Sequence, residues 1–138
     1  MTLHAFTDGA SRGNPGVSGI GLLVRNEAGD TVLEEHGYIG TATNNIAEYA
    51  ALVVLLKRAR KWQCSRLLVH SDSELMVRQV NGQYRVRDET LRKYHTQVMK
   101  LLAGSPFPVQ VLHVSRQENR HADRLANRGI DARKRIRV

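Results

Sequence analysis

Alternating apolar and polar residues at the start of the chain predict a three-stranded antiparallel sheet. Residues 3–8 alternate, and residues 19–26 and 31–39 form two further runs of strand character. A polar turn at residues 26–30 separates the second run from the third. Because the connections between these runs are short, we expect each strand to pair antiparallel with the next.

Helical spacing dominates the rest of the chain. Between Asn45 and Lys61, apolar residues recur every three or four positions, which predicts an amphipathic helix. The later patterns predict, in order, a strand at 66–71, a short helix at 73–81, a helix at 88–103, a strand at 108–114 and a last helix that ends near Gly129. A helix between two strands implies a crossover and therefore a parallel pair. The sequence thus predicts an α/β fold: a mixed five-stranded sheet, three antiparallel strands followed by parallel strands, flanked by helices.

The length and charge of the chain suit one basic domain. Its 138 residues can form one folding unit, which we place at residues 1–131, followed by a basic tail at 132–138 that we expect to be mobile or weakly docked. Lys and Arg number 21 against 13 Asp and Glu, so the surface favours polyanions such as nucleic acids. Cys64 is the single cysteine and no segment resembles a leader or a membrane span. We therefore expect a cytoplasmic monomer with no membrane partner.

Four carboxylates fall where the predicted elements converge. If the strands at 3–8 and 66–71 are parallel neighbours, Asp8 and Asp72 leave the sheet at the same edge. Glu48 lies in the first turn of the long helix and Asp123 in the second turn of the last one, so both can point at that edge. Carboxylates in such proximity repel one another unless they share protons or hold a cation. A hard divalent ion such as Mg²⁺ prefers these oxygen ligands.

Each carboxylate taken alone also has a structural interpretation. Asp72 can cap the helix that follows it, and Glu48 resembles the acidic member of a capping box that starts at Asn45. Asp8 can belong to a turn, and Asp123, flanked by arginines, can be a solvated charge. The convergence of all four favours one metal site over four coincidences. One cysteine and six scattered histidines lack the spacing of a zinc site.

The glycine-rich stretch DGASRGNPG at residues 8–16 is not a nucleotide-binding loop. Its glycines match neither GxxxxGK[ST] nor GxGxxG, and no helix follows to bind a phosphate. We expect residues 13–16 to turn the chain from the first strand into the second and to let the backbone approach a ligand. At the other end of the chain, residues 115–118 fit a capping box for the last helix.

Four segments in this order, DGASRGNPG, TNNIAEYAAL, HSDSELMVRQVNG and ENRHADRLANRG, resemble ribonuclease HI over residues 3–131. The resemblance implies the ribonuclease H-like fold, in the short-loop bacterial or archaeal branch that lacks a basic protrusion. It places the metal-binding acids of the family on Asp8, Glu48, Asp72 and Asp123, which are the residues already reached from their placement. The implied activity is endonucleolytic hydrolysis of the RNA strand of RNA/DNA hybrids, leaving 5′-phosphate and 3′-hydroxyl ends. The implied cofactors are two Mg²⁺ ions, with Mn²⁺ as a substitute.

A division of labour among the four acids follows from this resemblance as a hypothesis. Asp8 bridges the two ions, Glu48 and Asp72 bind one of them, and Asp123 binds the other. Glu48 also lies near the 2′-hydroxyl group of the RNA.

The same resemblance implies residues that contact the hybrid. Asn14, Asn44 and Asn45 fall where the minor groove is read, and their amides offer both donors and acceptors. Thr43 falls in the pocket that grips a phosphate of the DNA strand, and Arg78 falls beside it. The structural alternatives are that Asn44 and Asn45 cap a helix, that Asn14 forms a turn and that Arg78 is solvated.

The chain departs from the family at two places. Many members carry a histidine in the loop before the last helix, whereas residues 114–119 contain none. His121 should point away from Asp123, because two helical residues subtend about 200°. Arg116 is the candidate for a cation near the scissile phosphate, with an ordinary surface arginine as the alternative. The connection 83–88 is too short for the basic handle of long-form members, so binding should be weaker or rely on other cations, including those of the tail.

Two other functions fit the sequence. Short-loop relatives can be less strict, so a broader nuclease would also cut double-stranded RNA. A non-catalytic nucleic-acid-binding module of the same fold is the second alternative. Such a module has no need of clustered negative charge that faces a phosphate, and the fold alone does not decide between these functions.

Overall fold

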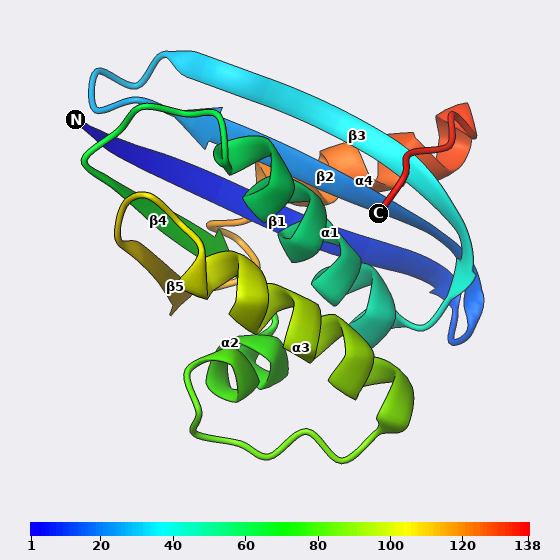
Figure 1. Ribbon diagram of the computed structural model, residues 1–138. Coiled ribbons are helices and arrows are strands. Elements are labelled where there is room, and N and C mark those ends of the chain that lie inside the picture. Colours follow the sequence, from blue (N-terminus) through cyan, green and yellow to red (C-terminus); the bar gives the residue numbers. More distant parts are fainter.

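Five strands form one mixed sheet in the order β3-β2-β1-β4-β5, in a computed structural model that describes all 138 residues (Figure 1). The strands are β1 (Thr2–Gly13), β2 (Gly16–Arg25), β3 (Thr31–Ala42), β4 (Arg66–Ser71) and β5 (Val109–His113). β1, β2 and β3 pair antiparallel, whereas β4 pairs parallel with both β1 and β5. The predicted fold class and sheet composition are confirmed.

Helices cover both faces of this sheet (Figure 1). They are α1 (Asn44–Ala59), α2 (Glu74–Val80), α3 (Glu89–Ala103) and α4 (Arg120–Ala132). α1 crosses one face with α3 beside it, and α4 packs on the opposite face against β2, β3 and β1. None of the helices has the length and apolar character needed to span a lipid bilayer.

The core lies between α1 and the sheet. From Ala47 to Leu56 every residue of α1 except Glu48 is buried, because the sheet covers one side of this helix and α3 covers another. A helix that is apolar on nearly all sides is stable only in such a central position. α1 is therefore the rigid element on which Glu48 is mounted.

A glycine in β2 lets α4 lie close to the sheet. A Cβ atom on Gly21 would lie 2.4 Å from the backbone oxygen of Ala122, so no other residue fits without moving the helix. Gly19 faces the oxygen of Ala126 at the same distance, one turn further along α4. These contacts fix the height of α4 above the sheet, and with it the position of Asp123.

The glycine-rich stretch at residues 8–16 is mostly strand rather than loop. β1 continues to Gly13 and pairs with β2 as far as Gly16, so that only Asn14 and Pro15 form the turn. The expected turn is confirmed, but it is shorter than the composition indicates. The reason is that regular antiparallel pairing satisfies the backbone groups of this stretch.

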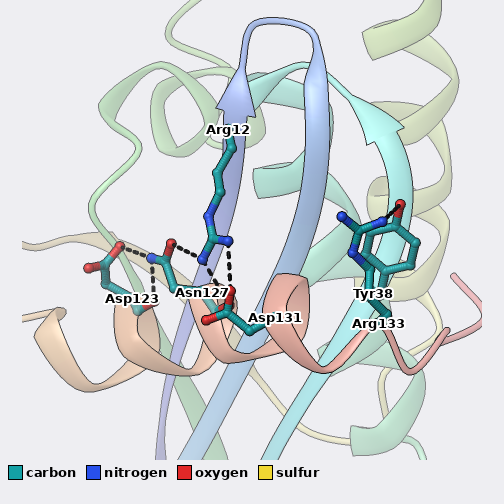
Figure 2. Close-up of polar contacts among 6 residues, drawn as sticks. All are labelled: Arg12, Tyr38, Asp123, Asn127, Asp131 and Arg133. Atoms are coloured by element: carbon teal, nitrogen blue, oxygen red, sulfur yellow. Dashed lines mark hydrogen bonds and ion pairs between the residues drawn. The ribbon is translucent and has the colours of Figure 1, made fainter.

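The basic tail lies against β3 and forms hydrogen bonds with its backbone. The N–H of Tyr38 donates to the oxygen of Lys134 at 2.9 Å, and the N–H of Ile136 donates to the oxygen of Tyr38 at 3.0 Å. The guanidinium of Arg133 lies 5.1 Å from the centroid of the Tyr38 ring (Figure 2). Ile136 packs where Gly37 leaves space. The tail therefore covers part of an edge strand that would otherwise expose its backbone groups.

Candidate active site

Two of the predicted carboxylates leave the sheet side by side. Phe6 of β1 pairs with His70 of parallel β4, and the same register carried two residues further sets Asp8 level with Asp72. Asp72 follows directly on the last residue of β4, and Asp8 is buried with 4% of its surface exposed. The sequence-based prediction that both acids share one sheet edge is confirmed.

Gly9 brings Glu48 against this pair. A Cβ atom on Gly9 would lie 2.2 Å from the carbonyl carbon of Ala47, so α1 approaches β1 only because the residue has no side chain. The N–H of Gly9 then donates to Oε1 of Glu48 at 2.8 Å. Glu48 thus accepts a hydrogen bond from β1 instead of closing a capping box. It lies just past the first turn of α1, and not within that turn as the sequence predicted.

Neighbouring hydroxyls take the capping roles that were considered for the acids and amides. Thr43 caps α1 by accepting the N–H of Ile46 at 3.2 Å. Ser73 caps α2 by accepting the N–H of Met76 at 3.3 Å. The capping interpretation is therefore wrong for Asp72, Glu48, Asn44 and Asn45, and the carboxylate of Asp72 does not serve α2.

Asp123 reaches the same region from α4. The buried side chain of Asn119 donates to the oxygen of Thr7 at 2.8 Å, which ties the start of α4 to β1 next to Asp8. Ser115 and Glu118 make the reciprocal bonds of the expected capping box, but these bonds close a turn before the helix. α4 itself begins at Arg120, so Asp123 lies in its first turn and not its second.

The four carboxylates line one open cavity of about 410 Å³. Ligand oxygens of Asp8, Glu48 and Asp72 all lie within 4.8 Å of one another. Asp123 stands outside this tighter group, but it lies near enough for its negative charge to raise the pKa of Asp8. The convergence predicted from the sequence is present, with three acids close together and the fourth beside Asp8.

This crowding changes how the acids hold protons. Burial raises the pKa of Asp8, and the negative charges of Glu48 and Asp72 raise it further. Burial and Asp72 likewise raise the pKa of Glu48, while the hydrogen bond from Gly9 opposes the rise. A cluster of this kind at neutral pH must bind protons or a cation. The atoms available as metal ligands are carboxylate oxygens, with no nitrogen or sulfur among them. This set suits a hard divalent ion such as Mg²⁺.

Of the expected substrate-binding residues, two line the acid cavity and the others lie outside it. Asn44 and Arg116 line the acid cavity, and the side chain of Asn14 accepts the N–H of Asn44 at 3.0 Å. Asn45 is exposed at the start of α1. Arg78 does not line the cavity: its guanidinium lies 3.0 Å from Glu74 on its own helix.

His121 points away from the acids, as its helical position predicts. Its ring nitrogen lies 3.4 Å from a carboxylate oxygen of Glu34 on β3. The loop before α4 therefore offers Arg116 as its cation toward the cavity.

The residues that hold the acids in place carry almost no signal in the sequence. They are Gly9, which binds Glu48, Asn119, which binds Thr7, and Arg12, which contacts Asn127 (Figure 2). Asn127 lies four residues after Asp123, one helical turn away, and that spacing is the only local signal that identifies any of them.

The sequence and the fold of this chain are both similar to those of known ribonucleases H. A family profile described as "Reverse transcriptase-like" matches residues 6–129. The ribonuclease HI of Halobacterium salinarum is 38% identical over 94% of this chain, and the ribonuclease H of Coxiella burnetii is 32% identical over 94% of this chain and 90% of its own length. The crystal structure of the Halobacterium salinarum ribonuclease H1 matches with a TM-score of 0.90 at 37% identity, over 96% of this chain and 99% of that one.

A further solved structure, LC11 ribonuclease H1 in complex with an RNA/DNA hybrid, matches with a TM-score of 0.88 at 36% identity, over 94% of this chain and 97% of that one. A Mycobacterium bovis protein is 41% identical over 96% of this chain. The chain spans 64% of the length of the halobacterial protein and 36% of the length of the mycobacterial one. Similarity of this extent in both sequence and fold means that the chain belongs to the ribonuclease H family.

Proposed function

We propose that this protein is an endoribonuclease that hydrolyses the RNA strand of RNA/DNA hybrids and leaves 5′-phosphate and 3′-hydroxyl ends. The observation that carries the proposal is the gathering of Asp8, Glu48, Asp72 and Asp123 around one open cavity. Negative charge that faces a phosphodiester is unfavourable for binding alone, so it has a purpose only where cations mediate the contact. One chain supplies all four acids, so we propose that a monomer suffices.

The four acids would hold two Mg²⁺ ions, or Mn²⁺ in their place. Asp8 would bridge them because it is close both to Glu48 and Asp72 and to Asp123. Bound divalent ions supply charge stabilisation at the phosphate and lower the pKa of water. The protein keeps Asp8 and Glu48 in place through burial and the Gly9 hydrogen bond, so little reorganisation is needed.

Arg116 would act on the substrate from the rim of the cavity. A guanidinium only donates hydrogen bonds and is always charged, so it suits a phosphate or a leaving oxygen that gains negative charge. Arg116 is exposed and lines the cavity with the acids. Arg116 would thus provide the positive charge that a histidine in the same loop would provide in many other members of the family.

The hybrid would cross the cavity with its minor groove over the turn of β1 and β2 and the start of α1. Asn14 and Asn44 are already joined there by a hydrogen bond, and Asn45 is exposed beside them. Thr43 accepts a backbone N–H as a cap, but its hydroxyl hydrogen remains free to donate to a phosphate of the DNA strand. Arg78 keeps further N–H groups beyond its bond to Glu74 for the same strand. The net charge of +8 supports binding to a polyanion.

The test compares cleavage and binding in one variant. Asp8→Asn should abolish cleavage of a labelled RNA/DNA hybrid in Mg²⁺ while hybrid binding is retained, and Asp30→Asn in the exposed β2–β3 turn should change neither. The wild type is digested in parallel with hybrid, double-stranded RNA and double-stranded DNA, with Mg²⁺, Mn²⁺ or a chelator. Mg²⁺-dependent turnover by Asp8→Asn would refute the assignment. Cleavage of double-stranded RNA would indicate the broader nuclease, and binding without cleavage a non-catalytic module.

A further inference from the structure

A line of polar contacts joins Asp123 to β1 (Figure 2). α4 carries Asp123, Asn127 and Asp131 at intervals of one turn, so the three side chains lie along one face of the helix. Arg12 lies four residues after Asp8 on β1 and therefore projects from the same face of the strand as Asp8. Its guanidinium lies 2.7 Å from Oδ1 of Asp131 and 3.5 Å from Oδ1 of Asn127.

The amide of Asn127 makes the link between Arg12 and Asp123. Its Nδ2 lies 3.1 Å from the backbone oxygen of Asp123 and 3.5 Å from carboxylate Oδ1 of the same residue. Arg12 also donates to the backbone oxygen of Asn127 at 3.4 Å. One side chain of β1 thus contacts both the backbone and the amide of the α4 residue that holds Asp123.

The donor chemistry of arginine fixes which way this amide points. A guanidinium has no acceptor, so the oxygen of the Asn127 amide must face Arg12. The NH₂ group of Asn127 then has to face Asp123, where it is a donor to a carboxylate. The reversed amide would set an oxygen against that carboxylate and an NH₂ group against Arg12, which is repulsive on both sides. Asp131 keeps the guanidinium in place by an ion pair.

Asp123 has particular need of such support. Asp8 is almost fully buried, and Glu48 accepts a backbone N–H from Gly9. Asp123 instead is only half-buried on the wall of the cavity, outside the group of acids whose oxygens lie within 4.8 Å of one another. A carboxylate that is free to rotate loses conformational entropy when it binds a cation, and a hydrogen bond reduces that loss.

We infer that Asn127, oriented by Arg12, is a positioning residue that holds the carboxylate of Asp123 in the geometry needed for a divalent cation. The inference rests on the proposed function and deepens it, because it assigns to β1 a second contribution to the site besides Asp8. Asn127 acts through Asp123, and Arg12 acts through Asn127.

The experiment measures metal affinity separately from activity. Mn²⁺ alone is titrated by calorimetry into the wild type, Asn127→Ala and Arg12→Ala without nucleic acid, and the thermal midpoint is measured in chelator. Asn127→Ala should weaken Mn²⁺ binding by roughly tenfold, as is usual when the hydrogen-bond partner of a metal ligand is removed. Arg12→Ala should weaken it less, and the double variant should match Asn127→Ala because the two residues act in series. Arg12 is half exposed, so its removal does not endanger the fold.

Cleavage kinetics provide a second readout. In Asn127→Ala, the Mn²⁺ concentration for half-maximal activity should rise by the same factor, while kcat at saturating Mn²⁺ and KM for the hybrid stay within about twofold of the wild type. In an Asp123→Asn background, Asn127→Ala should cause no further loss of Mn²⁺ affinity. The matched control is Arg58→Ala, which breaks an exposed arginine–carboxylate pair with Glu35 away from the cavity and should leave all values unchanged.

Three results would overturn the inference. Unchanged Mn²⁺ affinity with a lower thermal midpoint would make Asn127 purely structural. A higher KM with unchanged Mn²⁺ affinity would make it a substrate contact. A further loss in the Asp123→Asn background would mean that it acts on another group. If the wild type neither binds Mn²⁺ nor cleaves the hybrid, the proposed function itself fails and the inference falls with it, which is distinct from failure of the variants alone.

Discussion

Replacing Asp8 by Asn should stabilise the metal-free protein. Asp8 is 4% exposed and faces the carboxylates of Glu48 and Asp72, so its ionised form is unfavourable in the folded state. Asparagine has nearly the same shape and carries no charge. Its NH₂ group can also donate to a neighbouring carboxylate. The substitution therefore removes repulsion without opening a cavity in the core.

The magnitude follows from the shift in the pKa of Asp8, which burial and the neighbouring acids raise from 3.8 to about 10. The folded protein keeps a proton that the unfolded chain has lost, so stability falls as the pH rises above the unfolded value. At about 1.4 kcal/mol per pH unit, the loss between pH 3.8 and 7 has an upper limit of roughly 4 kcal/mol. Water in the open cavity screens the charges, so we expect Asp8→Asn to recover about 2 kcal/mol at pH 7.

Thermal unfolding in chelator between pH 4 and pH 8 measures this effect. At pH 7 the midpoint of Asp8→Asn should exceed that of the wild type by roughly 5–10 °C. The difference should shrink toward pH 4, where the unfolded chain also binds the proton. Excess Mg²⁺ should raise the midpoint of the wild type by mass action and that of the variant much less. Asp30→Asn removes an exposed carboxylate and serves as the control.

Equal midpoints at pH 7, or a difference that does not depend on pH, would refute this reasoning. Either result would mean that the acids are farther apart or better solvated in solution. The proposed cation site would then lose its main electrostatic support.

Four further predictions concern other parts of the molecule. Gly9→Ala should destabilise the protein by about 1–3 kcal/mol through overpacking and lower kcat at least roughly tenfold by moving Glu48, as urea unfolding and hybrid cleavage would measure. Tyr49→Phe should cost about 1–3 kcal/mol because it leaves the buried side chain of Gln79 without its 2.7 Å partner, while activity per folded molecule stays constant. Arg116→Ala should reduce kcat roughly tenfold with little change in KM, and similar activity would remove Arg116 from the mechanism. Deleting residues 132–138 should lower the free energy of unfolding by about 2 kcal/mol, because β3 loses two hydrogen bonds and the contact with Ile136. The same deletion should raise KM and flatten its salt dependence if the tail also contacts the hybrid.

The order and type of every helix and strand could be predicted from the sequence. Hydrophobic periodicity is a local property, so each segment carries its own signal, as α1 does between Asn45 and Lys61. The meeting of Asp8 and Asp72 was also predictable, because the ends of parallel neighbouring strands share one sheet edge. Their placement did not require knowledge of any side-chain contact.

The caps and element boundaries were less predictable. Thr43 and Ser73 cap their helices although Asn44, Asn45 and Asp72 beside them have similar intrinsic preferences. Adjacent polar residues can bond the same N–H groups. Which residue forms the cap depends on how the chain leaves the sheet to enter each helix. Backbone pairing likewise extended β1 into a stretch whose glycines indicate a loop.

The way in which the acids are held depends on contacts that form only in the folded protein. Gly9 bonds Glu48 across 39 residues, Asn119 bonds Thr7 across 112, and Arg12 contacts Asn127 across 115. The tail, similarly, is fixed by Tyr38 on a distant strand. Each contact depends on the docking of α1 or α4 against the sheet, which is set by the packing of many side chains together. A sequence pattern records which residues are polar or apolar along one segment, whereas these partners meet only after separate segments have packed.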